Sequence, residues 1–161
     1  VYAVDVGTNQ LVWKLRNDSR VVVKEKTNFR HATTDLFEYE LPNIATIDVS
    51  FISLKLIFEP LKDILNDGDD IVALIKPQFE AGREDVGKKG IVKDAKIHQR
   101  VIENVISYAN ECQFSIQNLT YSPITGGEGN IEFLAHFKVG GTNSLLQVEQ
   151  VVQEAHDCFK G

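Results

Sequence analysis

The feature that most restricts the fold is an alternation of short β-branched apolar runs with longer segments of helical periodicity. Most of the apolar runs are continuous, which is typical of strands covered on both faces, as in a parallel sheet. Strand–helix alternation of this kind predicts an α/β fold with a doubly wound sheet. The predicted strands are residues 1–6, 20–25, 44–49, 71–75, 113–121 and 131–138.

The segments that separate or follow these strands carry apolar residues at helical spacing. Thr8 is placed to cap a helix that carries Leu11, Val12 and Leu15. A second helix is expected to kink near Pro60 and to stop before Gly68. The three longer predicted helices are residues 53–65, 94–110 and 143–159.

The last two predicted strands break this rhythm. They are joined by SPITGGEGN, nine residues rich in Gly and Pro. A parallel connection needs a crossover of a dozen or more residues, so these strands should form an antiparallel hairpin. We therefore expect a mostly parallel sheet that ends in one antiparallel strand.

The composition suits a single soluble globular domain of 161 residues. The net charge of −6 argues against broad electrostatic binding of nucleic acid, although a local basic patch is compatible with it. No apolar run approaches the roughly 20 residues that span a bilayer. Cys112 and Cys158 have no metal or redox spacing, and neither do the histidines. We expect buried thiols, no metal site and a cytoplasmic protein.

Charged and polar side chains gather where the predicted strands end. In open α/β sheets, ligands bind beyond the carboxyl ends of the parallel strands. The first four strands end in or are followed by Asp5, Asn28, Asp48 and Lys76, and Glu132 lies near the start of the reversed last strand. The topology should bring all five residues to one rim. We expect Lys76 to meet Asp48 and Glu132 there.

Each of these residues also has a purely structural interpretation. Asp5 can cap the following helix, and Asn28 can be a turn residue. Asp48 can be a charge at a helix N-terminus, and Lys76 with Glu132 can be a structural ion pair. The segment TGGEGN has the composition of a phosphate-binding loop. It enters a strand rather than a helix, which favours a hairpin turn.

Five motifs, in order along the chain, resemble the hemolysin A (TlyA) family, whose catalytic domain is similar to the FtsJ-type RNA ribose 2′-O-methyltransferases. They are VYAVDVG, EKTNFR, IDVSFISL, ALIKPQFEAGRE with VGKKGIV, and SPITGGEGNIEFL. The resemblance implies a Rossmann-like S-adenosylmethionine-dependent methyltransferase domain over residues 1–161. It also implies methyl transfer to a ribose 2′-hydroxyl of ribosomal RNA.

The resemblance assigns catalytic residues as well. FtsJ-type enzymes use a Lys-Asp-Lys-Glu tetrad, whose last three members match Asp48, Lys76 and Glu132. A ribose hydroxyl must lose its proton as the methyl group arrives, and a lysine takes it only when partly neutral. The resemblance thus implies that Lys76 is the base, that Asp48 orients it and that Glu132 holds a cationic partner. No metal is required.

The family pattern also implies binding roles. Asp5 would bind the ribose hydroxyls of S-adenosylmethionine, and Asn28 and Glu25 would lie beside its adenine. The loop at residues 82–93, GREDVGKKGIVK, is interpreted as a mobile flap near the RNA backbone, with a solvated loop as the alternative. Its basic residues are Arg83, Lys88, Lys89 and Lys93.

Several family features precede the point where this sequence begins. They are the glycine-rich cofactor loop, the first tetrad lysine, an S4-like RNA-binding domain and the first, central strand of the sheet. We expect the first, central strand to lie between the strands that start at Val1 and Ile44. We also expect this chain to be inactive on its own. The alternatives are a membrane-active hemolysin, a dehydrogenase, for which no G-x-G-x-x-G motif is present, and an inactive RNA-binding relative. The last would be expected to lack Lys76 or Asp48.

Overall fold

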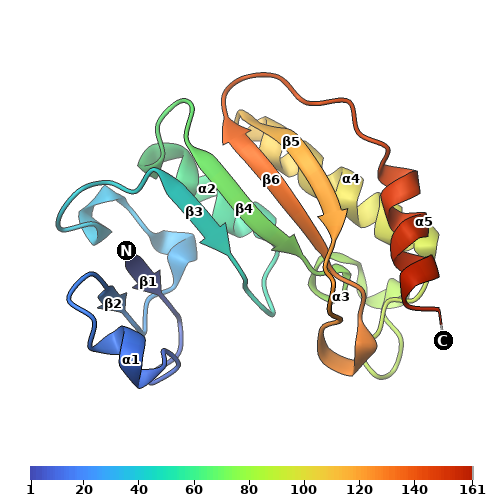
Figure 1. Cartoon of the computed structure of the whole chain (residues 1–161), viewed down its shortest axis with the longest axis horizontal. Helices are drawn as coiled ribbons and strands as arrows, with labels where there is room; N and C mark the ends of the chain where they lie inside the picture. Colours follow the sequence, from blue (N-terminus) through green and yellow to red (C-terminus); the bar gives the residue numbers. More distant parts are fainter. Residues whose placement is uncertain (161) are drawn as a thin grey trace.

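The computed structural model describes residues 1–160 and contains two sheets flanked by helices (Figure 1). The smaller sheet pairs β1 (Tyr2–Val4) with β2 (Val22–Lys24) in parallel. The larger sheet has the strand order β3-β4-β6-β5. Its strands are β3 (Ile44–Ile47), β4 (Asp70–Ile75), β5 (Phe114–Tyr121) and β6 (Phe133–Val139). The predicted α/β class is confirmed.

The larger sheet contains one reversed strand. β3 and β4 are parallel, whereas β6 is antiparallel to both β4 and β5. β5 therefore runs in the same direction as β4, and the predicted β5–β6 hairpin is confirmed. In the β4–β6 register, Ile75 pairs with Phe133. The adjoining residues Lys76 and Glu132 consequently come at the same edge of the sheet.

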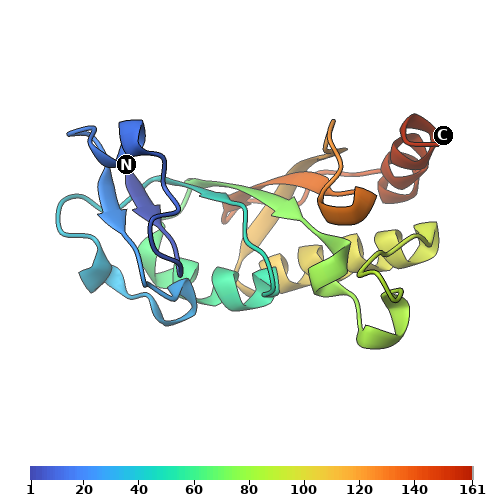
Figure 2. The same ribbon diagram turned by 90° about the horizontal axis from the view of Figure 1, so that it is seen from below.

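Two long helices cover one face of this sheet (Figure 2). Ser53 caps α2 (Leu54–Ile64), because its side chain accepts a hydrogen bond from the Lys55 amide. Asp94 caps α4 (Ala95–Glu111) in the same way, by accepting from the Lys96 amide. The central Phe58 of α2 lies edge-on to Phe114 and Phe137 of the sheet, with ring centroids 5.8 and 5.5 Å apart. No helix within residues 1–160 is long and apolar enough to cross a membrane.

Two predicted helix beginnings are wrong. The first helix, α1, is one turn (Trp13–Arg16) whose N-cap position is Val12 rather than Thr8. The reason is that the segment after β1 forms a turn at Asp5 and bonds to Glu25, which follows β2 (Val22–Lys24). The last helix, α5 (Val148–Cys158), begins later than predicted. The preceding residues pair with β5 instead, where Asn143 Oδ1 accepts from the Ile116 amide at 3.0 Å.

The second face of the larger sheet is less covered than predicted. In β4, Ile71, Ala73 and Ile75 are buried, whereas the alternate positions are only half-buried. On the neighbouring strands Ile44 is 52% exposed and Leu134 is 36% exposed. The reason is that α2 and α4 pack on the same face, whereas α5 packs against β5 and α4 at the far edge (Figure 2).

A groove of about 1190 Å³ lies between β1 and β3. Tyr2 and Val4 line it on one side, and Ile44, Thr46 and Asp48 line it on the other. Within residues 1–160, β1 pairs only with β2 and β3 only with β4, so both strands that border the groove have an unpaired edge. The groove lies where the sequence predicts a further strand.

Candidate active site

Lys76 lies where β4 ends and the single turn α3 (Pro77–Glu80) begins. Pro77 stops the strand, because it lacks an N–H and has the φ value of a first helical residue. The Lys76 side chain is 12% exposed, and its Nζ lies 2.5 Å from Oδ1 of Asp48 and 3.3 Å from Oγ of Ser50. Asp48 follows β3 and is 69% exposed. The predicted contact between Lys76 and Asp48 is present.

Glu132 reaches the same rim but does not pair with Lys76, and that part of the prediction is wrong. Within residues 1–160 its hydrogen-bond donor is Nε2 of Gln78, at 2.8 Å from Oε2. Glu132 is only 8% exposed, and Gly126 packs so closely that an added Cβ would stand 2.2 Å from Oε2. Gln78 and Gly126 thus hold this carboxylate, while the Lys76 amine bonds to Asp48.

The short turn α3 is fastened to the start of α2 by Glu80. Its carboxylate accepts hydrogen bonds from Oγ of Ser53 at 2.7 Å and from the amide of Leu54 at 2.8 Å. Burial raises the pKa of Glu80 above its ordinary value. This contact fixes the turn that carries both Lys76 and Gln78.

Sequence reasoning did not identify Gln78, Glu80 or Gly126 as site residues. The one available signal is position, because Gln78 and Glu80 follow Lys76 within KPQFE. Gly126 stands out only as half of a Gly-Gly pair, and its packing against Glu132 depends on a tertiary contact.

The predicted cofactor residues lie beyond β1 and β2. Asp5 is exposed, and its Oδ1 accepts from the Gly7 amide at 2.8 Å instead of capping a helix. Asn28 is also exposed and accepts from the Arg30 amide at 3.1 Å. The backbone bond from Thr27 N to Asp5 O, 2.9 Å long, holds the two loops together. Asp5 and Asn28 therefore lie close together, beyond the carboxyl ends of β1 and β2.

Glu25 has a different environment. Its carboxylate forms an ion pair with Arg16 and accepts a hydrogen bond from the Asn9 amide at 3.0 Å. These contacts tie the α1 segment to β2. They occupy both oxygens of Glu25 with groups of the protein itself.

The loop at residues 82–93 is anchored near its C-terminal end. Oδ1 of Asn130 accepts from the Val92 amide at 3.0 Å, and Nδ2 of Asn130 donates to the Gly90 carbonyl at 2.9 Å. The Val92 carbonyl contacts Nε2 of the buried His98 at 2.8 Å. Since a carbonyl only accepts, His98 carries its proton on Nε2. Asn130 thus joins this loop to the turn that precedes Glu132.

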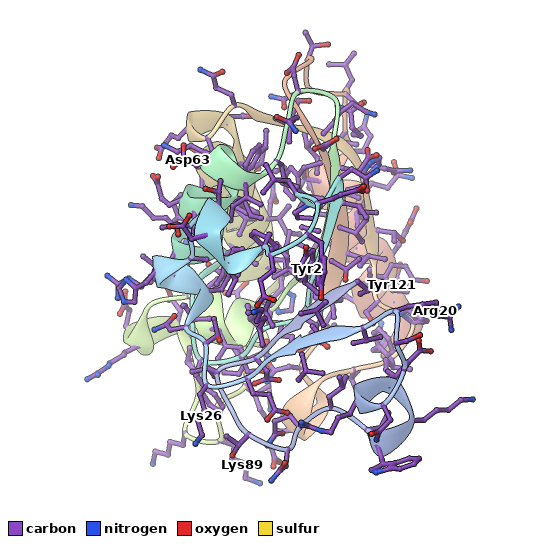
Figure 3. All side chains as sticks on the ribbon, turned by 90° about the vertical axis from the view of Figure 1, so that its left-hand side faces the viewer. Tyr2, Arg20, Lys26, Asp63, Lys89 and Tyr121 are labelled. Carbon is purple, nitrogen blue, oxygen red and sulfur yellow. The ribbon has the colours of Figure 1, made fainter. Side chains whose placement is uncertain are left out.

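The basic residues of this loop are all exposed, and none forms an ion pair within residues 1–160. Figure 3 shows Lys89 and Lys26 toward one end of the molecule and Asp63 toward the other. Lys26 follows β2 and Lys89 follows β4, so this end carries the carboxyl ends of those strands. The exposed basic residues of the loop at residues 82–93 are Arg83, Lys88, Lys89 and Lys93.

Among residues 1–160 there is no cluster of three or more His, Cys, Asp or Glu side chains placed to hold a metal ion. The rim presents one amine, two carboxylates and one amide, those of Lys76, Asp48, Glu132 and Gln78.

The family model for FtsJ-like methyltransferases matches residues 1–139. Bacillus subtilis YqxC, provisionally described as an rRNA methyltransferase, is 54% identical over 165 residues, which cover 99% of this chain and 59% of that protein. The Mycobacterium tuberculosis 16S/23S rRNA (cytidine-2′-O)-methyltransferase TlyA is 40% identical over 133 residues, covering 83% of this chain and 49% of that protein. The chain thus spans about half the length of these relatives.

Solved structures agree with these matches. A Streptococcus thermophilus protein provisionally described as a hemolysin superposes with a TM-score of 0.95 at 54% identity, covering 99% of this chain and 59% of that one. A Listeria monocytogenes protein described as an S-adenosylmethionine-dependent methyltransferase shares the fold with a TM-score of 0.60 at 14% identity, covering 88% and 80%. The chain belongs to the FtsJ-like methyltransferase family, in the branch that contains the hemolysin A (TlyA) proteins.

Proposed function

We propose that the full-length protein transfers a methyl group from S-adenosylmethionine to a ribose 2′-hydroxyl of ribosomal RNA. The observation that carries this proposal is the nearly buried amine of Lys76, which lies against Asp48 at the carboxyl end of the sheet with Glu132 on the same rim. Family membership supports the reaction class, and the name of the M. tuberculosis relative supports the ribose 2′-oxygen as acceptor.

The proposed roles follow from the charges. Lys76 accepts the proton of the attacking hydroxyl, and Asp48 orients its amine. Asp48 is exposed, so RNA bound at the rim would cover it and remove water from its contact with Lys76. S-adenosylmethionine, when bound, supplies an already activated methyl group. The remaining task of the protein is therefore to align hydroxyl and methyl.

The cofactor is proposed to lie beside the groove between β1 and β3. Asp5 offers a carboxylate to ribose hydroxyls, and Asn28 offers an amide beside the base. Glu25 is the weaker candidate, because Arg16 and the Asn9 amide already occupy its oxygens. Ligands of open α/β sheets bind in a crevice at such strand ends, which agrees with this placement.

We assign the groove itself to a further parallel strand of the full-length protein. Two unpaired strand edges border it, and its apolar lining includes Val4 and Ile44. This assignment makes residues 1–161 part of a methyltransferase domain, and it leaves an S4-like RNA-binding domain to the remaining length. Calorimetric titration with S-adenosylmethionine tests it. The full-length protein should bind, and residues 1–161 alone should not bind with micromolar affinity.

The exposed loop at residues 82–93 is proposed to contact the RNA backbone. Its lysines and arginine are free of ion pairs among the described residues, and Asn130 and His98 hold it next to the rim. A local basic loop on an acidic chain positions an RNA without holding nucleic acid over a broad surface. An acceptor of this kind places the protein in the cytoplasm.

The experiment that tests the proposed function identifies the methylated atom. Full-length protein is incubated with S-adenosylmethionine labelled on its methyl group and with purified ribosomal subunits, and the RNA is then hydrolysed with alkali. A methylated 2′-oxygen blocks cleavage of the adjoining phosphodiester, so we expect the label in alkali-resistant dinucleotides. Label in free mononucleotides would show base methylation, and label in protein alone would exclude RNA as the acceptor.

A further inference from the structure

The side-chain amide of Gln78 lies against the carboxylate of Glu132, and its two ends differ sharply. Nε2 donates a hydrogen bond to Oε2 of Glu132 at 2.8 Å. Oε1 is buried without a hydrogen-bond partner, and it is the one side-chain polar atom within residues 1–160 of which this is true. Buried polar groups are nearly always paired, so an unpaired one indicates that a competing requirement prevails.

The competing requirement is that of the carboxylate. An ionised carboxylate only accepts hydrogen bonds, so the amide must turn its NH₂ group toward Glu132 and its oxygen elsewhere. A hydrogen bond to a charged acceptor is about twice as strong as one between neutral groups. The free energy gained from this hydrogen bond therefore exceeds the cost of leaving Oε1 of Gln78 without a partner. The orientation of Gln78 is thus set by the carboxylate of Glu132.

The position of Gln78 is set by its neighbours rather than by Glu132 alone. It lies in the single turn α3, between Lys76 and Glu80, and Glu80 is bonded to Ser53 and Leu54 at the start of α2. The amide is consequently held at a fixed distance from the rim. Glu132 takes part in none of the ion pairs of residues 1–160, so the neutral amide is the donor that faces it.

We propose that Gln78 is a positioning residue that holds the carboxylate of Glu132 aimed at the rim. The inference rests on the proposed function, in which Glu132 shares the rim with Lys76 and Asp48. It divides the rim into two parts: Asp48 holds the amine of Lys76, and Gln78 holds Glu132 through a neutral donor. The charge of Glu132 then stays available to a hydrogen-bond donor or cation that completes the site.

The test uses three variants of the full-length protein. Gln78→Leu keeps most of the side-chain volume and removes the donor. Gln78→Glu keeps the shape and places a second carboxylate beside Glu132. The control is Gln150→Leu, because Gln150 on the exposed side of α5 donates to Glu154 at 3.0 Å, which is the same amide–carboxylate pair away from the rim.

The main measurement is the rate of methyl transfer to ribosomal RNA as a function of RNA concentration. For Gln78→Leu we expect kcat to fall at least about tenfold and KM to stay within about twofold, because the carboxylate is misplaced while binding is retained. For Gln78→Glu we expect a larger fall in kcat, because this variant also places a second carboxylate beside Glu132. Gln150→Leu should match the wild type. Wild-type kcat for both Gln78 variants would overturn the inference.

A second measurement does not depend on activity. The ¹³C chemical shift of the Glu132 side-chain carboxyl is measured by NMR in the full-length protein, in the wild type, in Gln78→Leu and in Gln150→Leu. We expect the shift to change in Gln78→Leu and to stay unchanged in Gln150→Leu, and an unchanged shift in Gln78→Leu would overturn the inference. A wild-type protein that methylates no RNA would refute the proposed function, whereas a changed shift in Gln78→Leu would still support the role of Gln78.

Discussion

Gly126 is the position at which a single methyl group should disable the proposed site. An alanine Cβ there would stand 2.2 Å from Oε2 and 2.6 Å from Cδ of Glu132, whereas ordinary contacts begin at 3.4 Å. The carboxylate or the backbone must therefore move by about 1 Å. The φ value of Gly126 is −83°, which alanine adopts without strain, so the effect is purely steric.

The size of the effect follows from this displacement. A misplacement of about 1 Å at a reacting centre costs on the order of 100-fold in rate, so we expect kcat of Gly126→Ala to fall by about that factor. The atoms that must move are the end of the Glu132 side chain rather than backbone, so the free energy of unfolding should change little. The neighbouring Gly127 is the matched control, because a Cβ there meets no atom within 4 Å. Gly127→Ala should stay within about twofold of wild type.

The assay is single-turnover methyl transfer by the full-length protein, with saturating S-adenosylmethionine and ribosomal subunits. Urea denaturation of the same samples shows that each variant is folded under the assay conditions. Equal rates for Gly126→Ala and Gly127→Ala would refute the placement of Glu132 at the reacting centre.

Three further predictions concern the core, the pH dependence and the RNA contact. Phe58→Ala removes a fully buried ring and should lower the unfolding free energy by about 3–5 kcal/mol in urea titrations. Burial lowers the pKa of His98 below its ordinary value of 6.5. The unfolded chain therefore binds more protons than the folded protein between the lowered pKa and 6.5, so the free energy of unfolding should fall as the pH drops below 6.5. The fall should be smaller in His98→Gln, and urea midpoints at several pH values would show it. The double variant Lys88→Gln and Lys89→Gln should weaken RNA binding and reduce the slope of log affinity against log salt by roughly 1.5 in filter binding, with S-adenosylmethionine affinity unchanged.

Much of the fold could be predicted because its signals are local. The runs at β3, β4, β5 and β6 are rich in apolar residues, and the nine-residue connection before β6 excludes a crossover helix. The caps Ser53 and Asp94 lie directly before periodic apolar segments, so the starts of α2 and α4 were predictable. The coverage of the sheet faces was not, because it depends on which face each helix packs against.

The candidate site divides in the same way. The rim that holds Lys76 and Asp48 follows from strand direction alone, and their contact is present. The hydrogen bond from Gln78 to Glu132 was not predicted, because the direction of a side chain within α3 depends on how Glu80 docks on α2. The close approach of Gly126 likewise exists only once the hairpin has folded.

The most direct test of the central claim compares two lysine–aspartate pairs of the larger sheet. Lys76 pairs with Asp48 at the carboxyl end of β4, and Lys138 pairs with Asp70 at the other end of that strand, with 3.3 Å between Nζ and Oδ1. The measurement is the rate of methyl transfer to ribosomal RNA by full-length Lys76→Met and Lys138→Met. We predict a loss of about 10²- to 10⁴-fold for Lys76→Met, the range of general acid–base catalysis, and no more than about twofold for Lys138→Met. Wild-type transfer by Lys76→Met would contradict the account.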